Sequence, residues 1–383
     1  MALILFLVLS LCITCCRVDA RSKTLIDEQN QFTLSKSIMH SMDNNFDCVD
    51  IYKQPALQHP LLKNHKIQLF PTFAKNVVRS RSSYGKTTDD CPLGKVPIYN
   101  RTRSHQTITN SSSKLHIDDF RRYSQSSQRY HTVTLDTTQN MKIYGAYTGI
   151  VGYELSVQAQ QYSLSAIWVE SGSSSELNSI KVGAGVFPTL YGDNQLRITG
   201  QWTADGYNQT GCFNSNCPGF VQVNRDKEYA LGSVISPPNS IGATQKLFAI
   251  FLIIQDRHSG HWWLYVENES KFVGYWPKDL FTHLKEGASL IRFGGQTYSP
   301  PNKNIPPMGS GRFPKEKFTN SSFMARLKII DSQRNEIDVK PEDMKPYRDT
   351  STNCYDLEYH GYEGPLYRQA FLYGGPGGPN CSK

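Results

Sequence analysis

The stretch NSIKVGAGVFP, residues 178–188, carries the pattern that decides the fold. Apolar residues at every second position alternate with Lys181, Gly183, Gly185 and Phe187. A period of two is typical of a β-strand with one apolar face. The other face sets a lysine beside two glycines, and glycine inside a strand often marks a close approach of another backbone or a ligand. The stretch therefore predicts the floor of a groove that holds a cation.

The chain from residue 131 onward repeats this strand pattern. Short β-branched or aromatic runs lie between Gly, Asn, Asp or Pro, for example YSLSAIWVESG (162–172), KLFAIFLIIQD (246–256) and SLIRFGGQTY (289–298). Many short strands with turn signals indicate an all-β protein, here an antiparallel β-sandwich over 131–383. KDLFTHLKEG (278–287) is the one helix that we predict in this part. A phosphate-binding glycine loop, a GxSxG elbow and an HExxH motif are all missing from the sequence.

The chain before residue 131 divides into three further parts. Residues 1–20 contain a short apolar run and end in Val-Asp-Ala, which predicts a secretory signal peptide cut after Ala20. We expect a small mixed unit over 21–100, helical near 25–44 and with a strand in CPLGKVPIY (91–99), whereas 46–68 reads as loops and turns. Residues 101–130 have the polar composition of a linker. Arg121 and Arg122 would suit a processing protease, and an uncut linker is the alternative.

The cysteines and glycosylation sequons agree with secretion to the outside of the cell or the cell wall. The signal peptide removes three of nine cysteines, and the six that remain allow 15 disulfide pairings. Closeness in sequence favours Cys212–Cys217 and Cys354–Cys381, which leaves Cys48 and Cys91. Zinc bound at His258 and His261 is a weaker hypothesis than disulfides for the cysteines and turn and strand positions for the histidines. We therefore predict neither a metal nor a cofactor. The Asn-x-Ser/Thr sequons lie at Asn100, Asn110, Asn208, Asn268, Asn320 and Asn380.

Charge is distributed unevenly along the chain. Residues 21–130 hold 17 basic and 9 acidic side chains, whereas 131–383 hold 23 of each. A basic segment can bind nucleic acid, but the secretion signal argues against such a partner. No later segment is long and apolar enough to span a bilayer. The sequence does not indicate an oligomeric state.

Several stretches in order resemble the neprosin family of plant secreted proteins. Residues 47–68 and 91–99 look like the activation peptide of that family, and the remaining matches include SIKVGAGVFPTLYGDN (179–194), QWTADGYNQTGCFNSNCPGFVQ (201–222) and MGSGRF (308–313). The resemblance covers nearly the whole chain after the signal peptide. It implies a β-sandwich peptidase that is made as a zymogen and cleaves after proline with two glutamates. Such a pair needs one ionised acid to activate water and one protonated acid to donate a proton.

Both glutamate positions of the family pattern differ in this chain. The resemblance places Lys181 at the first and Gln296 at the second. A protonated ammonium cannot accept a proton, and an amide can only donate a hydrogen bond to an oxyanion. Since a glutamine–glutamate pair serves other glutamic peptidases, Gln296 alone would not abolish catalysis. We therefore predict an inactive homologue that retains a peptide-binding groove.

Two alternatives stay open at this point. A relocated carboxylate, Glu170 or Glu176, could restore an active acid peptidase. Glu170 also fits an exposed strand end and Glu176 an exposed turn, and either could form a surface ion pair with Lys181. The chain could also be a structural glycoprotein without a groove ligand. In the favoured reading, a cationic polar groove binds an acidic or carbonyl-rich peptide, or a proline-rich protein. Besides Lys181 and Gln296, that groove is formed by Gly183, Gly185, Arg292 and Gly294.

Two further groups of side chains are expected to serve the fold. Asp193 and Asp205 precede or adjoin turn-forming Gly or Asn, so we expect them to stabilise turns. Strand aromatics more often belong to a core than to a binding groove. We expect a core position for Tyr207, Trp262, Trp263, Tyr275 and Trp276.

Overall fold

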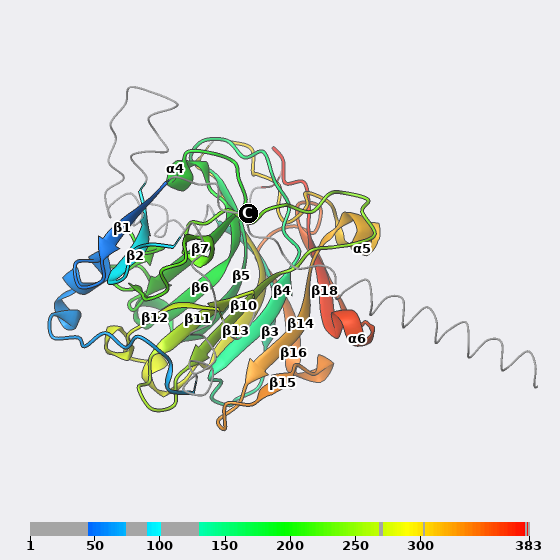
Figure 1. Ribbon diagram of the computed structural model, residues 1–383. Helices are drawn as coiled ribbons and strands as arrows, with labels where there is room; N and C mark the ends of the chain where they lie inside the picture. The colour runs from blue at the N-terminus through cyan, green and yellow to red at the C-terminus, as the bar shows by residue number, and fades with distance from the viewer. Residues whose placement is uncertain are drawn as a thin grey trace, which may run out of the picture.

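Two antiparallel β-sheets face each other in the structure, which is a computed structural model (Figure 1). It describes residues 45–73, 90–100, 130–267, 271–301, 303–379 and 381. The predicted signal peptide, the 25–44 helix and nearly all of the 101–130 linker lie outside the described residues. The prediction of an all-β sandwich is confirmed. The boundaries between the proposed units stay predictions.

The seven-stranded sheet contains the stretch that decides the fold, which forms β6. β6 lies between β5 and β7, so both of its edges are paired. In spatial order the strands are β16 (Met344–Arg348), β3 (Tyr130–Thr137), β13 (Leu290–Tyr298), β5 (Tyr162–Ser171), β6 (Asn178–Val186), β7 (Arg197–Thr203) and β8 (Cys212–Phe213).

The nine-stranded sheet forms the second layer. Its strands in order are β17 (Asp356–Tyr362), β18 (Gln369–Gly374), β14 (Ser322–Ile330), β4 (Gly145–Ile150), β10 (Ala249–Gln255), β11 (Trp262–Val266), β12 (Phe272–Trp276) and β9 (Val221–Gln222), with β15 (Glu336–Asp338) paired to β14. The short helices of the described residues are η1 (Pro55–Gln58), η2 (Pro60–Leu62), η5 (Ser174–Glu176), α4 (Pro188–Tyr191), η6 (Lys227–Tyr229), η7 (Lys278–Leu280), η8 (Leu284–Glu286), η9 (Pro314–Glu316), α5 (Lys317–Asn320), η10 (Pro341–Asp343) and α6 (Gly364–Tyr367).

The core lies between the two sheets, and alternation along the strands explains it. Ile180, Val182 and Ala184 of β6 join the main buried apolar cluster, together with Trp262 and Trp276 from the other sheet. Since successive strand side chains point to opposite faces, Lys181 and its glycine neighbours face away from this core. The apolar half of the opening pattern therefore builds the sandwich, and the polar half builds an outer face.

Trp263 and Tyr275 are buried on the outer side of the nine-stranded sheet. They pack in a cluster that also contains Ala56 from the N-terminal unit, so this outer face is covered by the chain itself. Tyr207 is only partly buried and lies in the loop after β7.

The N-terminal unit contains a hairpin that the sequence reading missed in part. Residues Phe46–Asp50 form β1, not a loop, and pair with β2 (Lys95–Tyr99) across the Cys48–Cys91 disulfide. The period-two signal in FDCVD is short and half polar, and only the partner strand stabilises it. Figure 1 shows this hairpin beside the β6–β7 side of the sandwich.

The segment that follows the hairpin crosses onto the nine-stranded sheet. Leu62 belongs to the main core cluster. The Gln54 side chain accepts from the backbone N–H of Gln222 at 2.8 Å and donates to its carbonyl at 3.2 Å, so it replaces a strand partner at the β9 edge. The N-terminal unit therefore supplies part of the core and protects one sheet edge.

The predicted helix over 278–287 is wrong. This stretch forms two separate three-residue helices, η7 and η8. The side-chain oxygen of Asn178 accepts the backbone N–H groups of Thr282 and His283, at 2.8 and 2.7 Å. These bonds take donors that a continuous helix would use. The sequence analysis also missed β8, β9 and the strands β15 to β18. Most of these are short or largely polar, but β18 is a fully buried strand of six residues.

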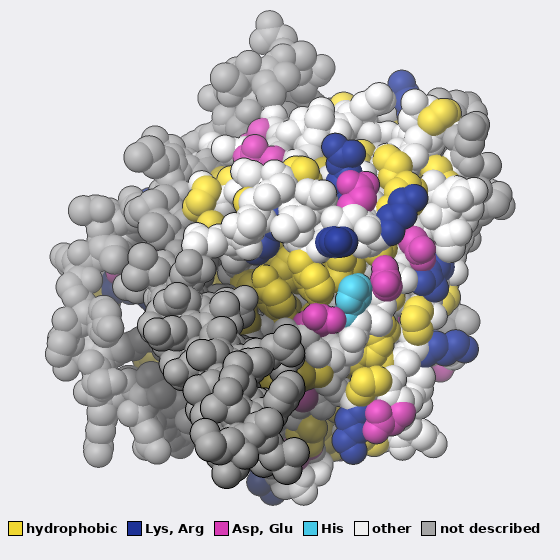
Figure 2. Space-filling view, turned by 90° about the vertical axis from the view of Figure 1, so that its right-hand side faces the viewer, with side chains coloured by type: hydrophobic (Ala, Val, Ile, Leu, Met, Phe, Trp, Pro, Cys, Tyr) yellow, Lys and Arg dark blue, Asp and Glu magenta, His cyan; other side chains and the backbone are white. Residues whose placement is uncertain are grey.

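The two disulfides favoured by closeness in sequence, Cys212–Cys217 and Cys354–Cys381, are present, and so is the remaining pair, Cys48–Cys91. None of the described helices is long and apolar enough to cross a membrane. The face in Figure 2 intersperses basic and acidic side chains. Separately, Lys328 pairs with Glu336, and Arg368 pairs with Asp338.

Candidate functional site

The outer face of the seven-stranded sheet brings the predicted site residues together in rows. Strand register aligns Arg292, Trp168, Lys181 and Gln201 in one row. The row of Gln296, Leu164, Gly185 and Arg197 lies four residues along the strands. Directly paired residues and those two or four apart share a face, so Lys181 and Gln296 lie on the same side. Between them runs a row of small residues, Gly294, Ala166 and Gly183.

Glycine is required at two positions of this middle row, because a neighbouring backbone passes close to each. A Cβ on Gly183 would lie 1.8 Å from the Ser165 carbonyl oxygen, and one on Gly294 would lie 2.2 Å from that of Val133. Gly185 is less constrained, with its nearest neighbour at 3.0 Å. The register places Ala166 midway between Lys181 and Gln296, so only a methyl group stands on the diagonal that joins them.

The Lys181 side chain extends along this diagonal, over Ala166, and contacts Gln296 directly. Its Nζ donates to Gln296 Oε1 at 2.7 Å and to Gln201 Oε1 at 3.2 Å, and lies 5.3 Å from the centroid of the Trp168 ring. The lysine is only 5% exposed. Burial lowers its pKa to about 8, against an opposing effect of the Glu170 charge. Lys181 is thus a nearly enclosed cation whose direct partners are neutral amides.

Gln296 is held in one orientation by its neighbours. Its Oε1 accepts from Lys181 and from the Tyr162 hydroxyl at 2.9 Å, and its Nε2 donates to Thr132 Oγ1 at 3.2 Å. The amide oxygen therefore faces the lysine, and the amide N–H group faces the opposite way. In this arrangement Gln296 acts as an acceptor at the site centre, not as the oxyanion donor that the sequence suggested.

Arg292 does not add free positive charge to the face. Its guanidinium lies 3.3 Å from Glu170 Oε2 and 3.4 Å from Asp136 Oδ2, and over the Tyr347 ring at 4.8 Å. Burial raises the pKa of the Asp136 carboxyl, although Arg292 opposes this. The expected cationic groove is corrected here, because two carboxylates match Arg292 and Lys181 is the unmatched cation of this group.

Glu170 and Glu176 differ sharply in position. Glu170 lies on the outer face one row beyond Lys181, where Ser179 Oγ donates to its Oε1 at 2.9 Å. It is not the exposed strand end that the sequence favoured. Glu176 is exposed in η5 and approaches His283 at 3.7 Å. Neither carboxylate forms the predicted ion pair with Lys181 within the described residues.

Sequence reasoning missed five residues that hold the site in place. They lie in strands and belong to no sequence motif. Alternation was their one available signal, because each lies on the same sheet face as a predicted site residue of its own strand or of a paired strand. Which strands pair, and in which register, decides their role. These residues are Thr132, Asp136, Tyr162, Trp168 and Gln201.

The N-terminal hairpin packs at one end of the outer face. Phe46 and Tyr99 share a buried cluster with Leu164 and Trp168. The Tyr99 hydroxyl donates to the Tyr191 carbonyl at 3.0 Å, and the Arg197 guanidinium lies 5.4 Å from the Tyr99 ring centroid. The unit that resembles an activation peptide therefore contacts the same face as Lys181.

The remaining predicted sites have partners other than Lys181 and Gln296. The carboxylate of Asp205 accepts backbone N–H groups of the turn after β7, and Asp193 pairs with Arg197 at 2.7 Å. His261 lies against His65 of the N-terminal unit, with ring centroids 5.3 Å apart. Of the sequons, Asn208 is exposed and Asn100 donates its amide to Asp47, while Asn320 ends α5 and Asn110, Asn268 and Asn380 lie outside the described residues.

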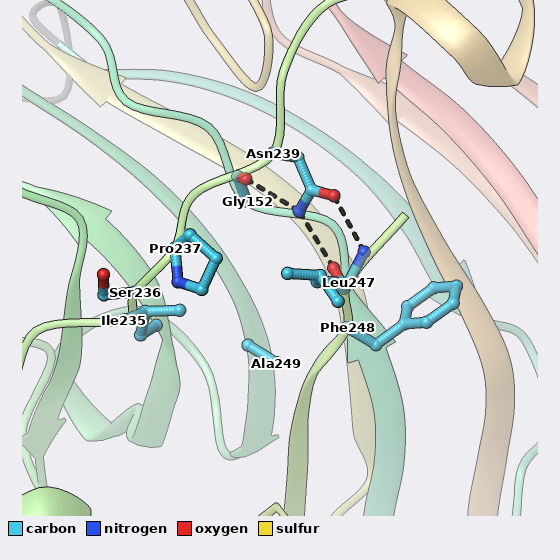
Figure 3. A pocket seen from close by; sticks show the side chains of 8 residues that line it. All are labelled: Gly152, Ile235, Ser236, Pro237, Asn239, Leu247, Phe248 and Ala249. Atoms are coloured by element: carbon cyan, nitrogen blue, oxygen red, sulfur yellow. Dashed lines mark hydrogen bonds between the residues drawn. The ribbon is translucent and has the colours of Figure 1, made fainter. Parts of the chain in front are cut away.

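A small pocket elsewhere offers no comparable chemistry (Figure 3). Asn239 supplies its main polar side chain, and this amide is fully engaged with the backbone of Gly152 and Leu247 at 2.8 to 3.1 Å. The rest of the lining is small or apolar, and no charged group orients a ligand. The pocket is lined by Gly152, Ile235, Ser236, Pro237, Asn239, Leu247, Phe248 and Ala249.

Fold and site together define a β-sandwich protein with a polar pair at the centre of one outer sheet face. Comparison with known families assigns it further. The neprosin family model matches residues 159–376, more than half of the chain, and the neprosin activation peptide model matches residues 38–147. The chain belongs to the neprosin family.

Two solved structures of scytalido-glutamic peptidase also align with the chain. One holds a peptide-based transition state analog, with 7% identity and a TM-score of 0.35 over 65% of this chain and 98% of that one. The other holds a transition state analog inhibitor, with 9% identity and a TM-score of 0.37 over 64% of this chain and 98% of that one.

Proposed function

We propose that this protein is a secreted, catalytically inactive neprosin homologue that binds peptides on the outer face of its seven-stranded sheet. The observation that carries the proposal is the Lys181–Gln296 hydrogen bond of 2.7 Å. The family resemblance implies that these positions correspond to the two catalytic glutamates, which supports the proposal. An amine and an amide there keep a hydrogen-bonded pair across the face and remove both carboxyl groups.

The chemistry of this pair does not support acid peptidase activity. At acid pH Lys181 is fully protonated, because its pKa of about 8 lies well above that range. An ammonium has no lone pair with which to activate water. Gln296 cannot ionise, and its oxygen is already occupied by Lys181 and Tyr162. The face can therefore hold a peptide but lacks a general acid and a general base at its centre.

One observation favours a second function, an active acid endopeptidase with relocated carboxylates. Glu170 and Asp136 lie on the same outer face, on either side of Arg292. Two carboxyl groups are the minimum for general acid and base roles. Against this, Arg292 pairs with both carboxylates, so neither is free to activate water or to donate a proton to a substrate. We therefore rank this function second.

A proteolysis assay tests the proposal. The secreted chain is incubated with a proline-rich protein substrate from pH 2.5 to 7, and the products are identified by mass spectrometry. We expect no cleavage by the natural chain and cleavage by the Lys181→Glu, Gln296→Glu double variant. The Glu170→Gln variant runs beside them.

The outcomes separate the two functions. Cleavage by the natural chain that Glu170→Gln removes would replace our proposal with the second function. Silence from the natural chain together with binding of a proline-rich peptide would support the first. An inactive double variant that still binds would mean that restoring the two acids is insufficient for catalysis, and the binding role would stand alone.

A further inference from the structure

Lys181 is an unmatched buried cation. No carboxylate among the described residues lies within ion-pair distance of its Nζ, and its two hydrogen-bond acceptors are the neutral amides of Gln201 and Gln296. An ammonium has three hydrogens to donate, so these acceptors leave one for a further partner. A charge that is 95% enclosed without a counter-ion is unfavourable, and the lowered pKa of Lys181 reflects this cost.

The neighbouring Arg292 shows the contrast. It is less buried, and two carboxylates already satisfy it. An incoming anion would therefore gain little at Arg292 and much at Lys181, where it replaces a neutral acceptor with a charged one. Charge-assisted hydrogen bonds are about twice as strong as neutral ones.

The middle row of small residues defines where the anion would lie. Between Lys181 and Gln296 stand only Gly183, Ala166 and Gly294. Gln296 is the partly exposed end of the pair, whereas Lys181 is the buried end. A ligand that displaces the Gln296 amide oxygen from Lys181 would thus enter from the Gln296 side. A carboxylate would supply the two oxygens needed to meet the ammonium.

We propose that Lys181 is a carboxylate-recognition site, and that the peptides bound by this face carry an acidic side chain or a free C-terminus at that point. This inference rests on the proposed peptide-binding function and specifies its ligand class. It also accounts for the positive charge of Lys181, which a purely structural contact between β6 and β13 would not require.

Calorimetric titration of the full secreted chain at pH 8.5 tests it. The first probe is a proline-rich peptide with a central Glu and an amidated C-terminus. The second has Gln in place of that Glu, and the third is the Gln peptide with a free C-terminal carboxylate. We expect a carboxylate-bearing peptide to bind at least tenfold more tightly than the amidated Gln peptide.

A second readout is specific to the lysine. Binding of a carboxylate restores a higher pKa to Lys181, so complex formation takes up about 0.7 proton per peptide at pH 8.5, starting from a pKa of about 8. Titration in two buffers of different ionisation enthalpy measures this uptake. Lys181→Met should abolish both the preference and the proton uptake.

The matched control is Lys246→Met. Lys246 is also buried, but its Nζ donates to the backbone carbonyls of Ser240 and Thr319, at 2.7 and 2.8 Å, away from the outer face. This variant should keep both signals. Equal binding of all three peptides would overturn the carboxylate inference and leave the groove function standing. Failure of every peptide to bind would overturn both proposals.

Discussion

Replacing Lys181 with methionine is predicted to stabilise the protein near neutral pH. Methionine matches the length of the lysine stem and carries no charge. The pKa of Lys181 is lowered from 10.5 to about 8 by burial. At about 1.4 kcal/mol per pKa unit, the charged lysine costs the folded state about 3 kcal/mol at pH 7.

The lost hydrogen bonds offset part of this gain. Gln296 Oε1 keeps its bond from Tyr162, but Gln201 Oε1 loses the ammonium as a donor. One unsatisfied acceptor costs about 1 kcal/mol. The net prediction is a variant that is more stable than the natural chain by about 2 kcal/mol at pH 7.

The dependence on pH provides the sharper test. Between about pH 8 and 10.5 the unfolded natural chain binds more protons at this lysine than the folded one, so its stability rises with pH. The variant lacks this contribution. Its advantage should shrink by about 2.5 kcal/mol from pH 7 to pH 10.

Urea denaturation of both proteins at pH 7, 8, 9 and 10 measures the difference, and titration of other groups cancels between them. Lys246→Met is measured beside them. Burial also lowers the pKa of Lys246, so its curve gives the size of this effect for a lysine that donates to two backbone carbonyls. Parallel stability curves, or a variant less stable than the natural chain at pH 7, would refute the description of Lys181 as an unmatched buried cation. A confirmed gain would mean that this lysine is retained at a cost to stability, as functional residues often are.

Three further predictions concern the N-terminal unit and the outer face. Burial, with a smaller effect of the nearby His65, lowers the pKa of His261 from 6.5 to about 4. Between these two pH values the unfolded chain binds more protons than the folded chain. Acidification from pH 6.5 to 4 should therefore remove about 3 kcal/mol of stability. His261→Phe should flatten this acid limb in a denaturant series, and an unchanged limb would contradict the assignment. Leu62→Ala should lower the free energy of unfolding of the whole sandwich by about 2 to 4 kcal/mol, because Leu62 lies in the main core; a loss below 1 kcal/mol would mean that the unit is only loosely attached. Glu170→Gln should destabilise the chain by about 1 to 3 kcal/mol by leaving Arg292 with Asp136 alone, and an unchanged midpoint would show that this ion pair contributes little.

The strands that alternate strictly were predictable from the sequence, whereas weakly patterned ones were not. β6 was visible because apolar residues recur at every second position from Ile180 to Val186, and β5 and β13 because they are rich in β-branched and aromatic residues. β1, β15 and β16 are short or half polar, so hydrogen bonding to a neighbour decides their conformation. The 278–287 stretch has helical composition, but Asn178 takes its backbone donors.

The sequence by itself determined which side chains share a face along each strand, because the strand period is a local property of the backbone. It thus separated Lys181 from the core and selected Arg292, Gly294 and Gln296 as one set. Only the tertiary structure decided that Arg292 is matched by Asp136 and Glu170, and that Lys181 spans Ala166 to reach Gln296. Register between strands distant in sequence sets these contacts. Electrostatic pairing depends on distances of a few ångströms across strands, which no local pattern encodes.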